Sequence, residues 1–172
     1  MRFLITPAAP DSPPAASLIA ALDDHLGRFY PQTSRHGYSI DKLLAQNVAF
    51  FLILDTDHPA PPTSPLSHAA VGCGGVLLVP RDHPQYRPPE EPYAEIKRMF
   101  IIPEMRGRHL GHLMLTHLAD HARSHGYSLL RLETGIHQQP AIRLYQRFGF
   151  TPIPPFGPYT DDPLNLCMEM RI

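Results

Sequence analysis

The chain has 172 residues, 43% of them hydrophobic and 21 of them proline, and its formal net charge is −1. This length fits a single domain, covering residues 1–172, with a core of its own. The balanced charge argues against a nucleic-acid partner, and no apolar stretch is long enough to span a membrane. The N-terminus has the pattern of a strand rather than a signal peptide, and Cys73 and Cys167 lie in apolar runs, so we expect free thiols in a cytoplasmic protein.

Apolar runs and helical spacing, separated by proline-rich turns, predict the secondary structure. In chain order we expect a strand at 3–6, helices at 15–30 and 40–46, strands at 48–54, 69–79 and 93–102, a helix at 109–125, a strand at 128–134, a helix at 138–148, and strands at 150–153 and 164–171. The early strands should form an antiparallel meander. The strand–helix–strand unit over 93–134 should be parallel. The predicted fold class is therefore α/β, with a mixed, α+β-like sheet.

A basic, glycine-containing turn joins the strand that ends near Pro103 to the following helix. Its sequence is Arg106-Gly107-Arg108-His109-Leu110-Gly111. The unpaired amides of a first helical turn, close backbone approach at glycine and arginine side chains together favour a phosphate group. A Walker loop would need Gly-Lys-Ser/Thr, which is absent, and the glycines at 72, 74 and 75 open no helix and are typical of a strand bulge or close packing. The turn therefore predicts a site for a phosphorylated cofactor.

This turn resembles the pyrophosphate loop of the GNAT superfamily of acyl-CoA-dependent N-acyltransferases, whose pattern is Arg/Gln-x-x-Gly-x-Gly/Ala. Arg106 and Gly111 match its ends, and His109 replaces the middle glycine. Residues 138–150 are similar to a second signature, Asn-x-x-Ala-x-x-Leu-Tyr-x-x-x-Gly-Phe, with Gln138 in place of asparagine. The positions that match are Ala141, Leu144, Tyr145, Gly149 and Phe150. The resemblance covers residues 93–150 and looks like a bacterial branch with poorly defined substrates.

The resemblance implies a GNAT fold, in which a mostly antiparallel sheet contains one parallel pair of strands that splays to hold acetyl-CoA. The acetyl group would pass by direct attack to a primary amine of a small molecule or peptide, and the resemblance also admits a homodimer. The cofactor-binding positions that it implies are Phe100, Ile101, Arg106, Gly107, Arg108, His109, Leu110, Gly111, His112, Gln138, Ala141 and Leu144.

The two predicted parallel strands carry charged residues, which is unusual because such strands are normally buried on both faces and apolar. Alternation places Glu95 on one face with Tyr93, Lys97 and Met99, and it places Glu133 on one face of the second strand. One explanation is a cross-strand ion network of both glutamates with basic neighbours. The other is a wet cleft that receives the thioester. For Glu133 the two explanations have equal weight.

The resemblance assigns a general base to Glu95, with Glu133 as the alternative. A base is needed because an amine with a pKa near 10.4 is neutral in only about 1 of 2,500 molecules at pH 7. Backbone amides near Phe100 or Ile101 would stabilise the oxyanion. Tyr145 resembles the family's donor to the CoA thiolate, whereas without the motif it would be read as a core aromatic.

Two further regions contain candidate functional residues: the loop between the last two strands, and one histidine-rich helix face. Tyr159, Asp161 and Asp162 are candidate acceptor-binding residues, because acidic groups suit an ammonium; a proline-stiffened turn is the alternative. Histidines at 117, 121 and 125 share a helix face but lack a further ligand, so we expect a solvated face and no metal. The departures at His109 and Gln138 leave a second function open, that of an acyl-CoA-binding sensor without turnover.

Overall fold

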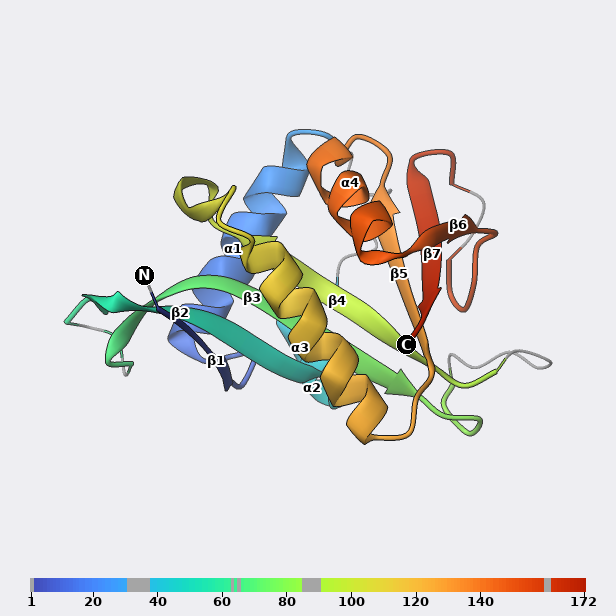
Figure 1. Cartoon of the computed structure of the whole chain (residues 1–172), viewed down its shortest axis with the longest axis horizontal. Coiled ribbons are helices and arrows are strands. Elements are labelled where there is room, and N and C mark those ends of the chain that lie inside the picture. The colour runs from blue at the N-terminus through green and yellow to red at the C-terminus, as the bar shows by residue number, and fades with distance from the viewer. Residues whose placement is uncertain (1, 31–37, 63, 65, 85–90, 160–161) are drawn as a thin grey trace.

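The computed structural model describes residues 2–30, 38–62, 64, 66–84, 91–159 and 162–172. Within them, a seven-stranded sheet has the order β1-β2-β3-β4-β5-β7-β6 (Figure 1). The elements are β1 (Phe3–Pro7), α1 (Pro13–Gly27), α2 (Ile40–Ala45), β2 (Ala49–Pro59), β3 (His68–Val79), β4 (Tyr93–Ile101), a 3₁₀ turn (Pro103–Met105), α3 (Leu110–Ser124), β5 (Leu129–Gly135), α4 (Gln139–Phe148), β6 (Thr151–Ile153) and β7 (Asn165–Arg171).

Local sequence signals explain where several helices begin and end. The Ser39 hydroxyl caps α2 by accepting a hydrogen bond from the Lys42 amide at 3.2 Å. Prolines occupy the first turns of α1 and α4, where a missing N–H costs nothing. Gly149 ends α4 at a φ of 116°, a backbone conformation that favours glycine.

The mixed sheet confirms the predicted fold class. Every neighbouring pair of strands is antiparallel except β4 and β5, which run parallel. These two strands pair at only two positions, Ala94 with Leu130 and Glu95 with Arg131. Beyond Glu95 they separate, as the splayed pair of the prediction requires.

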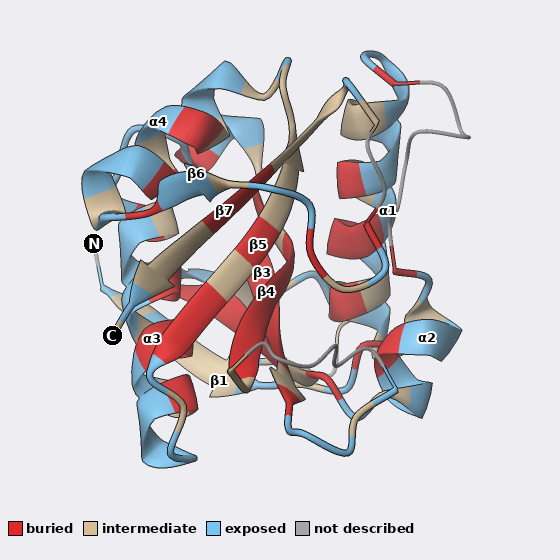
Figure 2. Cartoon of the chain, turned by 90° about the vertical axis from the view of Figure 1, so that its right-hand side faces the viewer, coloured by how far each residue is buried: buried red, intermediate tan, exposed pale blue. Residues whose placement is uncertain are grey.

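Helices cover both faces of the sheet (Figure 1), and their inner faces are buried (Figure 2). On one face, α1 and α2 contribute Leu18 and Leu43 to a core with Leu52 of β2. On the other face, α3 and α4 contribute Met114 and Tyr145 to a second core. The cleft between β4 and β5 therefore has α1 on one side and α4 on the other.

A β-bulge interrupts β4 and corrects the predicted alternation. Lys97 pairs with Gly75 and Phe100 with Cys73, so two residues of β4 oppose Gly74 alone. Arg98 takes up the extra length with a φ of 54°. Met99 consequently packs on the α3 side, opposite to the face that holds Glu95 and Lys97, and its predicted placement on their face was wrong.

Other parts of the structure extend or qualify the predictions. β2 continues to Pro59, beyond the predicted end at Leu54, because it regains pairing with β3 at His68 after a register shift. Cys73 and Cys167 are both buried free thiols, as expected. Among the helices of the described ranges, none is long and apolar enough to cross a membrane. The described residues also contain no group of three or more potential metal ligands.

Candidate active site

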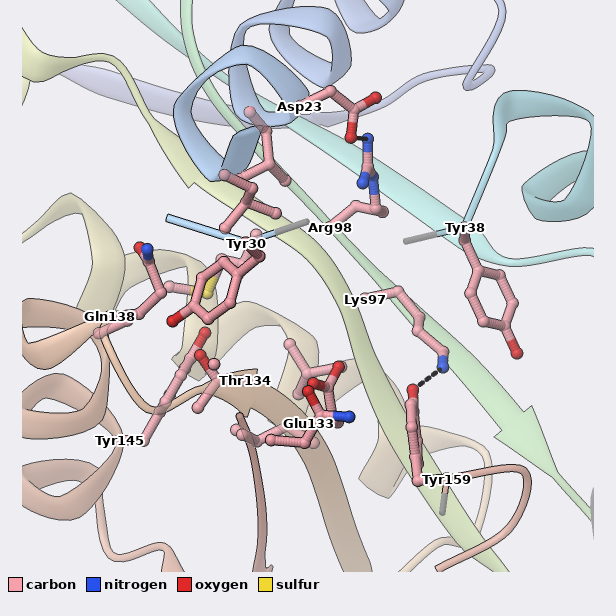
Figure 3. A pocket seen from close by; sticks show the side chains of 18 residues that line it. Asp23, Tyr30, Tyr38, Lys97, Arg98, Glu133, Thr134, Gln138, Tyr145 and Tyr159 are labelled. Carbon is pink, nitrogen blue, oxygen red and sulfur yellow. Dashed lines mark hydrogen bonds and ion pairs between the residues drawn. The ribbon is translucent and has the colours of Figure 1, made fainter. Parts of the chain in front are cut away.

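A cavity of about 150 Å³ lies where β4 and β5 part (Figure 3). Its walls come from the second half of α1, from residues 96–99 of β4, from residues 132–135 of β5 and from α4 with the residue before it. Tyr38 and Tyr159 line it from segments far apart in the sequence. The opening in the sheet is thus lined by β4 and β5, by α1 and α4, and by four tyrosines, which are Tyr30, Tyr38, Tyr145 and Tyr159.

Glu133 and Tyr145 line this cavity together (Figure 3). Burial raises the pKa of Glu133 to about 7, against the attraction of the Lys97 ammonium and with the repulsion of Glu95 and Asp162. Burial, with a smaller effect of Glu133, raises the pKa of Tyr145 to about 12. At neutral pH, Glu133 can therefore exchange a proton, whereas Tyr145 keeps its own and can donate a hydrogen bond.

Glu95 does not line the cavity. It belongs to a buried polar cluster with Lys97 and Tyr159. Lys97 forms an ion pair with Glu95 and donates to the Tyr159 hydroxyl at 2.8 Å. The Tyr159 hydroxyl in turn donates to Glu95 at 2.5 Å. The Lys97 ammonium also lies 3.9 Å from the centre of the Tyr38 ring. Burial lowers the pKa of Lys97, and the neighbouring Glu95 partly restores it.

Arg98 faces away from Glu133 and toward α1 (Figure 3). Its guanidinium forms an ion pair with Asp23 at 2.8 Å and donates to the Ile19 carbonyl at 3.3 Å. This contact ties the β4 bulge to α1 at the rim of the cavity. Asp23, Tyr30 and Tyr38 were absent from the sequence predictions, because single residues on a helix or in a loop carry no recognisable spacing.

The predicted phosphate loop forms an exposed surface at the start of α3. Gly107 and His109 both adopt the left-handed backbone region, with φ of 77° and 61°. His109 is the N-cap of α3 and makes no side-chain cap, and the first turn carries no acidic residue. Arg106 is held by a hydrogen bond from its Nε to the Ile101 carbonyl at 3.1 Å. The first-turn amides of α3 therefore donate no hydrogen bond to the His109 side chain.

Gly111 has a packing role at the same helix end. A Cβ at this position would lie 2.7 Å from Cδ2 of Leu144, so glycine lets α3 approach α4. The Leu110 side chain is buried. His112 is exposed and packs edge-on against Phe148, with ring centres 5.1 Å apart.

The end of α1 and the residues that follow it contact the turn before α4. The Tyr30 hydroxyl accepts a hydrogen bond from the His137 amide at 2.7 Å. His25 Nε2 lies 3.2 Å from Oε1 of Gln138, which lines the cavity together with Ala141. Gln138, the residue that departs from the family signature, thus anchors the β5–α4 turn to α1.

Tyr30 packs directly against Gly135, and we predict that Gly135→Ala destabilises the fold. The added Cβ would lie 2.2 Å from the Tyr30 hydroxyl and ring, so the end of α1 must move. We expect a loss of about 1–3 kcal/mol in the free energy of unfolding, measured by urea denaturation. In the background of Tyr30→Ala the same change should cost much less. Equal costs in both backgrounds would contradict the proposed clash.

Several predicted residues lie elsewhere. Phe100 and Ile101 do not line the cavity, whose β4 wall extends from Ile96 to Met99. Asp162 does not line it either, and its carboxylate accepts from the Leu164 amide at 2.9 Å; Asp161 lies outside the described residues.

The expected solvated histidine face is correct only in part. His117 and His121 are half-buried, with ring centres 4.4 and 5.3 Å from that of Phe51, and burial lowers the pKa of both. His125 is exposed.

The fold and this cleft define an acyl-CoA N-acyltransferase, and comparisons with known proteins agree. The acetyltransferase (GNAT) family matches residues 19–150. The chain therefore belongs to the GNAT family, as its motifs suggested, and it is an N-acetyltransferase whose acyl donor is acetyl-CoA.

Individual relatives extend over nearly the whole chain. An IAA acetyltransferase of Azospirillum brasilense is 37% identical over 152 residues, which are 88% of this chain and 86% of that protein. The crystal structure of a Klebsiella pneumoniae protein assigned as an acyl-CoA N-acyltransferase has a TM-score of 0.74 and 32% identity, and covers 98% of this chain and 97% of that one. An Elizabethkingia anophelis GNAT acetyltransferase with acetyl-CoA bound shares the fold, with a TM-score of 0.63, 16% identity and coverage of 99% and 98%.

Proposed function

We propose that this N-acetyltransferase transfers the acetyl group directly to a primary amine of a small molecule or peptide, with Glu133 as general base and Tyr145 as donor to the CoA thiolate. The observation that carries the proposal is the cavity between the parted β4 and β5, which these two side chains line together. In this proposal the acceptor enters the opening from the α1 face of the sheet and acetyl-CoA enters from the α4 face, so the transfer needs no acyl-enzyme intermediate.

Glu133 is favoured over Glu95 as the base. A general base works best with a pKa near the working pH, and the pKa of Glu133 is about 7. Glu95 is already bonded to Lys97 and Tyr159 and does not line the cavity. Glu133 takes the proton of the acceptor ammonium, directly or through one water, and the freed nitrogen lone pair attacks the thioester carbonyl carbon.

Tyr145 acts on the leaving group, the CoA thiolate. As the new C–N bond forms and the C–S bond breaks, negative charge moves to the departing sulfur. The attacking nitrogen then loses its second proton, which converts the departing thiolate to the CoA thiol and leaves a neutral amide. The Tyr145 hydroxyl, whose pKa is about 12, stabilises that thiolate by donating a hydrogen bond. Exposed amides at the start of α3, with Arg106 and Arg108, would hold the diphosphate. Gln138, Ala141 and Leu144 would flank the pantetheine arm from α4.

The acceptor would bind on the α1 side of the cavity. Leu22, Leu26 and Tyr30 supply apolar surface there, and Tyr38 and Tyr159 supply rings with hydroxyl groups. These residues suit an amine with an apolar portion. Because one relative is named an IAA acetyltransferase, IAA belongs among the compounds that are tested.

The function is tested by incubating the protein with acetyl-CoA and a library of amines, amino acids, peptides and IAA. We expect mass spectrometry to find at least one acetylated product that forms in step with thiol release. Binding of acetyl-CoA without thiol release on any compound would instead favour the acyl-CoA sensor.

We predict that His109→Gly leaves the dissociation constant of acetyl-CoA unchanged or lowers it. Glycine accepts the φ of 61° freely and removes a Cβ beside the proposed diphosphate site, while the amide donor remains. Isothermal titration calorimetry measures the effect. The control His109→Ala removes the imidazole but keeps the backbone strain. Binding more than about tenfold weaker in both variants would show that the imidazole itself contacts phosphate.

A further inference from the structure

Two buried charges, Lys97 in the cavity lining and Glu95 beside it, have no step in the proposed reaction. Glu95 is 0% exposed and Lys97 is 5% exposed. They are bonded to each other, and both are bonded to the Tyr159 hydroxyl. A buried ion pair gives little net stability, because removing both charges from water costs about as much as their attraction returns. The pair therefore calls for a reason other than stability.

The contacts of Lys97 join three separate parts of the chain. Lys97 lies on β4, Tyr159 lies in the segment after β6, and Tyr38 lies just before α2. The Lys97 ammonium donates to the Tyr159 hydroxyl and is 3.9 Å from the Tyr38 ring centre (Figure 3). Both tyrosines line the α1 side of the cavity, so one lysine fixes two of its walls.

The same pair also contributes to the electrostatic environment of Glu133. The Lys97 cation favours the carboxylate form of Glu133, whereas burial, Glu95 and Asp162 oppose it. The titratable groups that interact with Glu133 come from every neighbouring element: Lys97 and Glu95 of β4, Tyr30 after α1, Tyr145 of α4, Cys167 of β7, and Tyr159 and Asp162 between β6 and β7. Lys97 is the cation among them.

We propose that Lys97 is a positioning residue for acetyl transfer and that Glu95 is its anchor rather than the base. Together they hold Tyr38 and Tyr159 in the acceptor part of the cavity and set the charge that faces Glu133. This inference rests on the proposed function, because Glu133 acts as the base only there.

The charge relation is tested without turnover by following the Glu133 side-chain carbon in ¹³C NMR titrations, with Glu133→Gln identifying the signal. Glu95→Gln should lower the Glu133 pKa and Lys97→Met should raise it, each by about one pH unit. The double variant should lie between them. Since Lys97→Met alone leaves a buried carboxylate without its cation, the double variant preserves the comparison if that single variant does not fold.

The positioning role is tested by steady-state kinetics on an acceptor found in the library. The double variant should raise the acceptor KM by about tenfold or more, while the dissociation constant of acetyl-CoA stays within about twofold. Arg171→Gln, which breaks an exposed ion pair with Glu91, is the control and should change neither value.

Two outcomes would overturn the inference. An unchanged Glu133 titration and acceptor KM in every folded variant would make the pair purely structural. Loss of turnover in Glu95→Gln with acceptor KM and Glu133 titration unchanged would make Glu95 the base. If the titrations follow the expected order but wild-type protein acetylates nothing, the proposed function fails while the charge relation stands.

Discussion

Glu133→Gln should lower kcat by about 10²- to 10⁴-fold at pH 7. The amide has nearly the same shape as the carboxylate but cannot accept the proton of the acceptor ammonium. In wild-type protein, kcat/KM should rise with pH through about 7, because the base must be deprotonated and its pKa is about 7. The variant should lose this rise. The rate of CoA thiol release, measured at a series of pH values from about 5.5 to 9, reports both effects.

Two controls separate chemistry from folding in this experiment. The dissociation constant of acetyl-CoA, measured by calorimetry, should stay within about twofold of the wild-type value, because the proposed diphosphate site at the start of α3 is not part of the cavity that Glu133 lines. Glu91→Gln makes the same chemical change at an exposed ion pair and should leave kcat unchanged. Full activity in Glu133→Gln would refute the assignment of Glu133 as base.

Tyr145→Phe should lower kcat more than it weakens acetyl-CoA binding. The hydroxyl lines the cavity and keeps its proton at neutral pH, so its main contribution comes when charge develops on the sulfur. A hydrogen bond to a charged group contributes about 1.5–3 kcal/mol, which corresponds to a loss of about 10- to 150-fold in kcat. Pre-steady-state thiol release measures it.

Tyr127→Phe is a matched control, because Tyr127 follows α3 and does not line the cavity. It should retain the wild-type kcat. If Tyr145→Phe reduced acetyl-CoA affinity and kcat in equal measure, the hydroxyl would serve to place the donor rather than to assist the departing thiolate.

Much of the fold could be predicted because its signals are local. Helix starts follow from Ser39 and from prolines in first turns, and the parallel β4–β5 pair follows from a strand–helix–strand pattern. Charges on those two strands pointed to a cleft, and a cavity is found where the strands separate. The spacing of two family motifs likewise assigned the loop before α3 and Tyr145 to the same predicted acetyl-CoA site.

The parts that could not be predicted depend on packing between distant segments. Nothing in the spacing near Tyr38 or Tyr159 indicates that both meet Lys97, and alternation cannot reveal that Glu95 is bonded to Tyr159. The preference for Glu133 over Glu95 as the proposed base also rests on the structure, because Glu133 lines the cavity and Glu95 does not. From the sequence, Gln138 is only a departure from the asparagine of the family motif. Its contact with His25 is visible only in the structure.

The bulge at Arg98 has a consequence for transferring residue roles between relatives. In a regular strand, side chains alternate between the two faces of the sheet. In β4 this alternation holds only as far as Lys97. After the additional residue, odd and even positions exchange sides, which brings Phe100 to the α1 core and Met99 to the α3 core. An alignment with a one-residue gap misplaced in this strand would therefore assign residues of the α1 core to the α3 core, and the reverse.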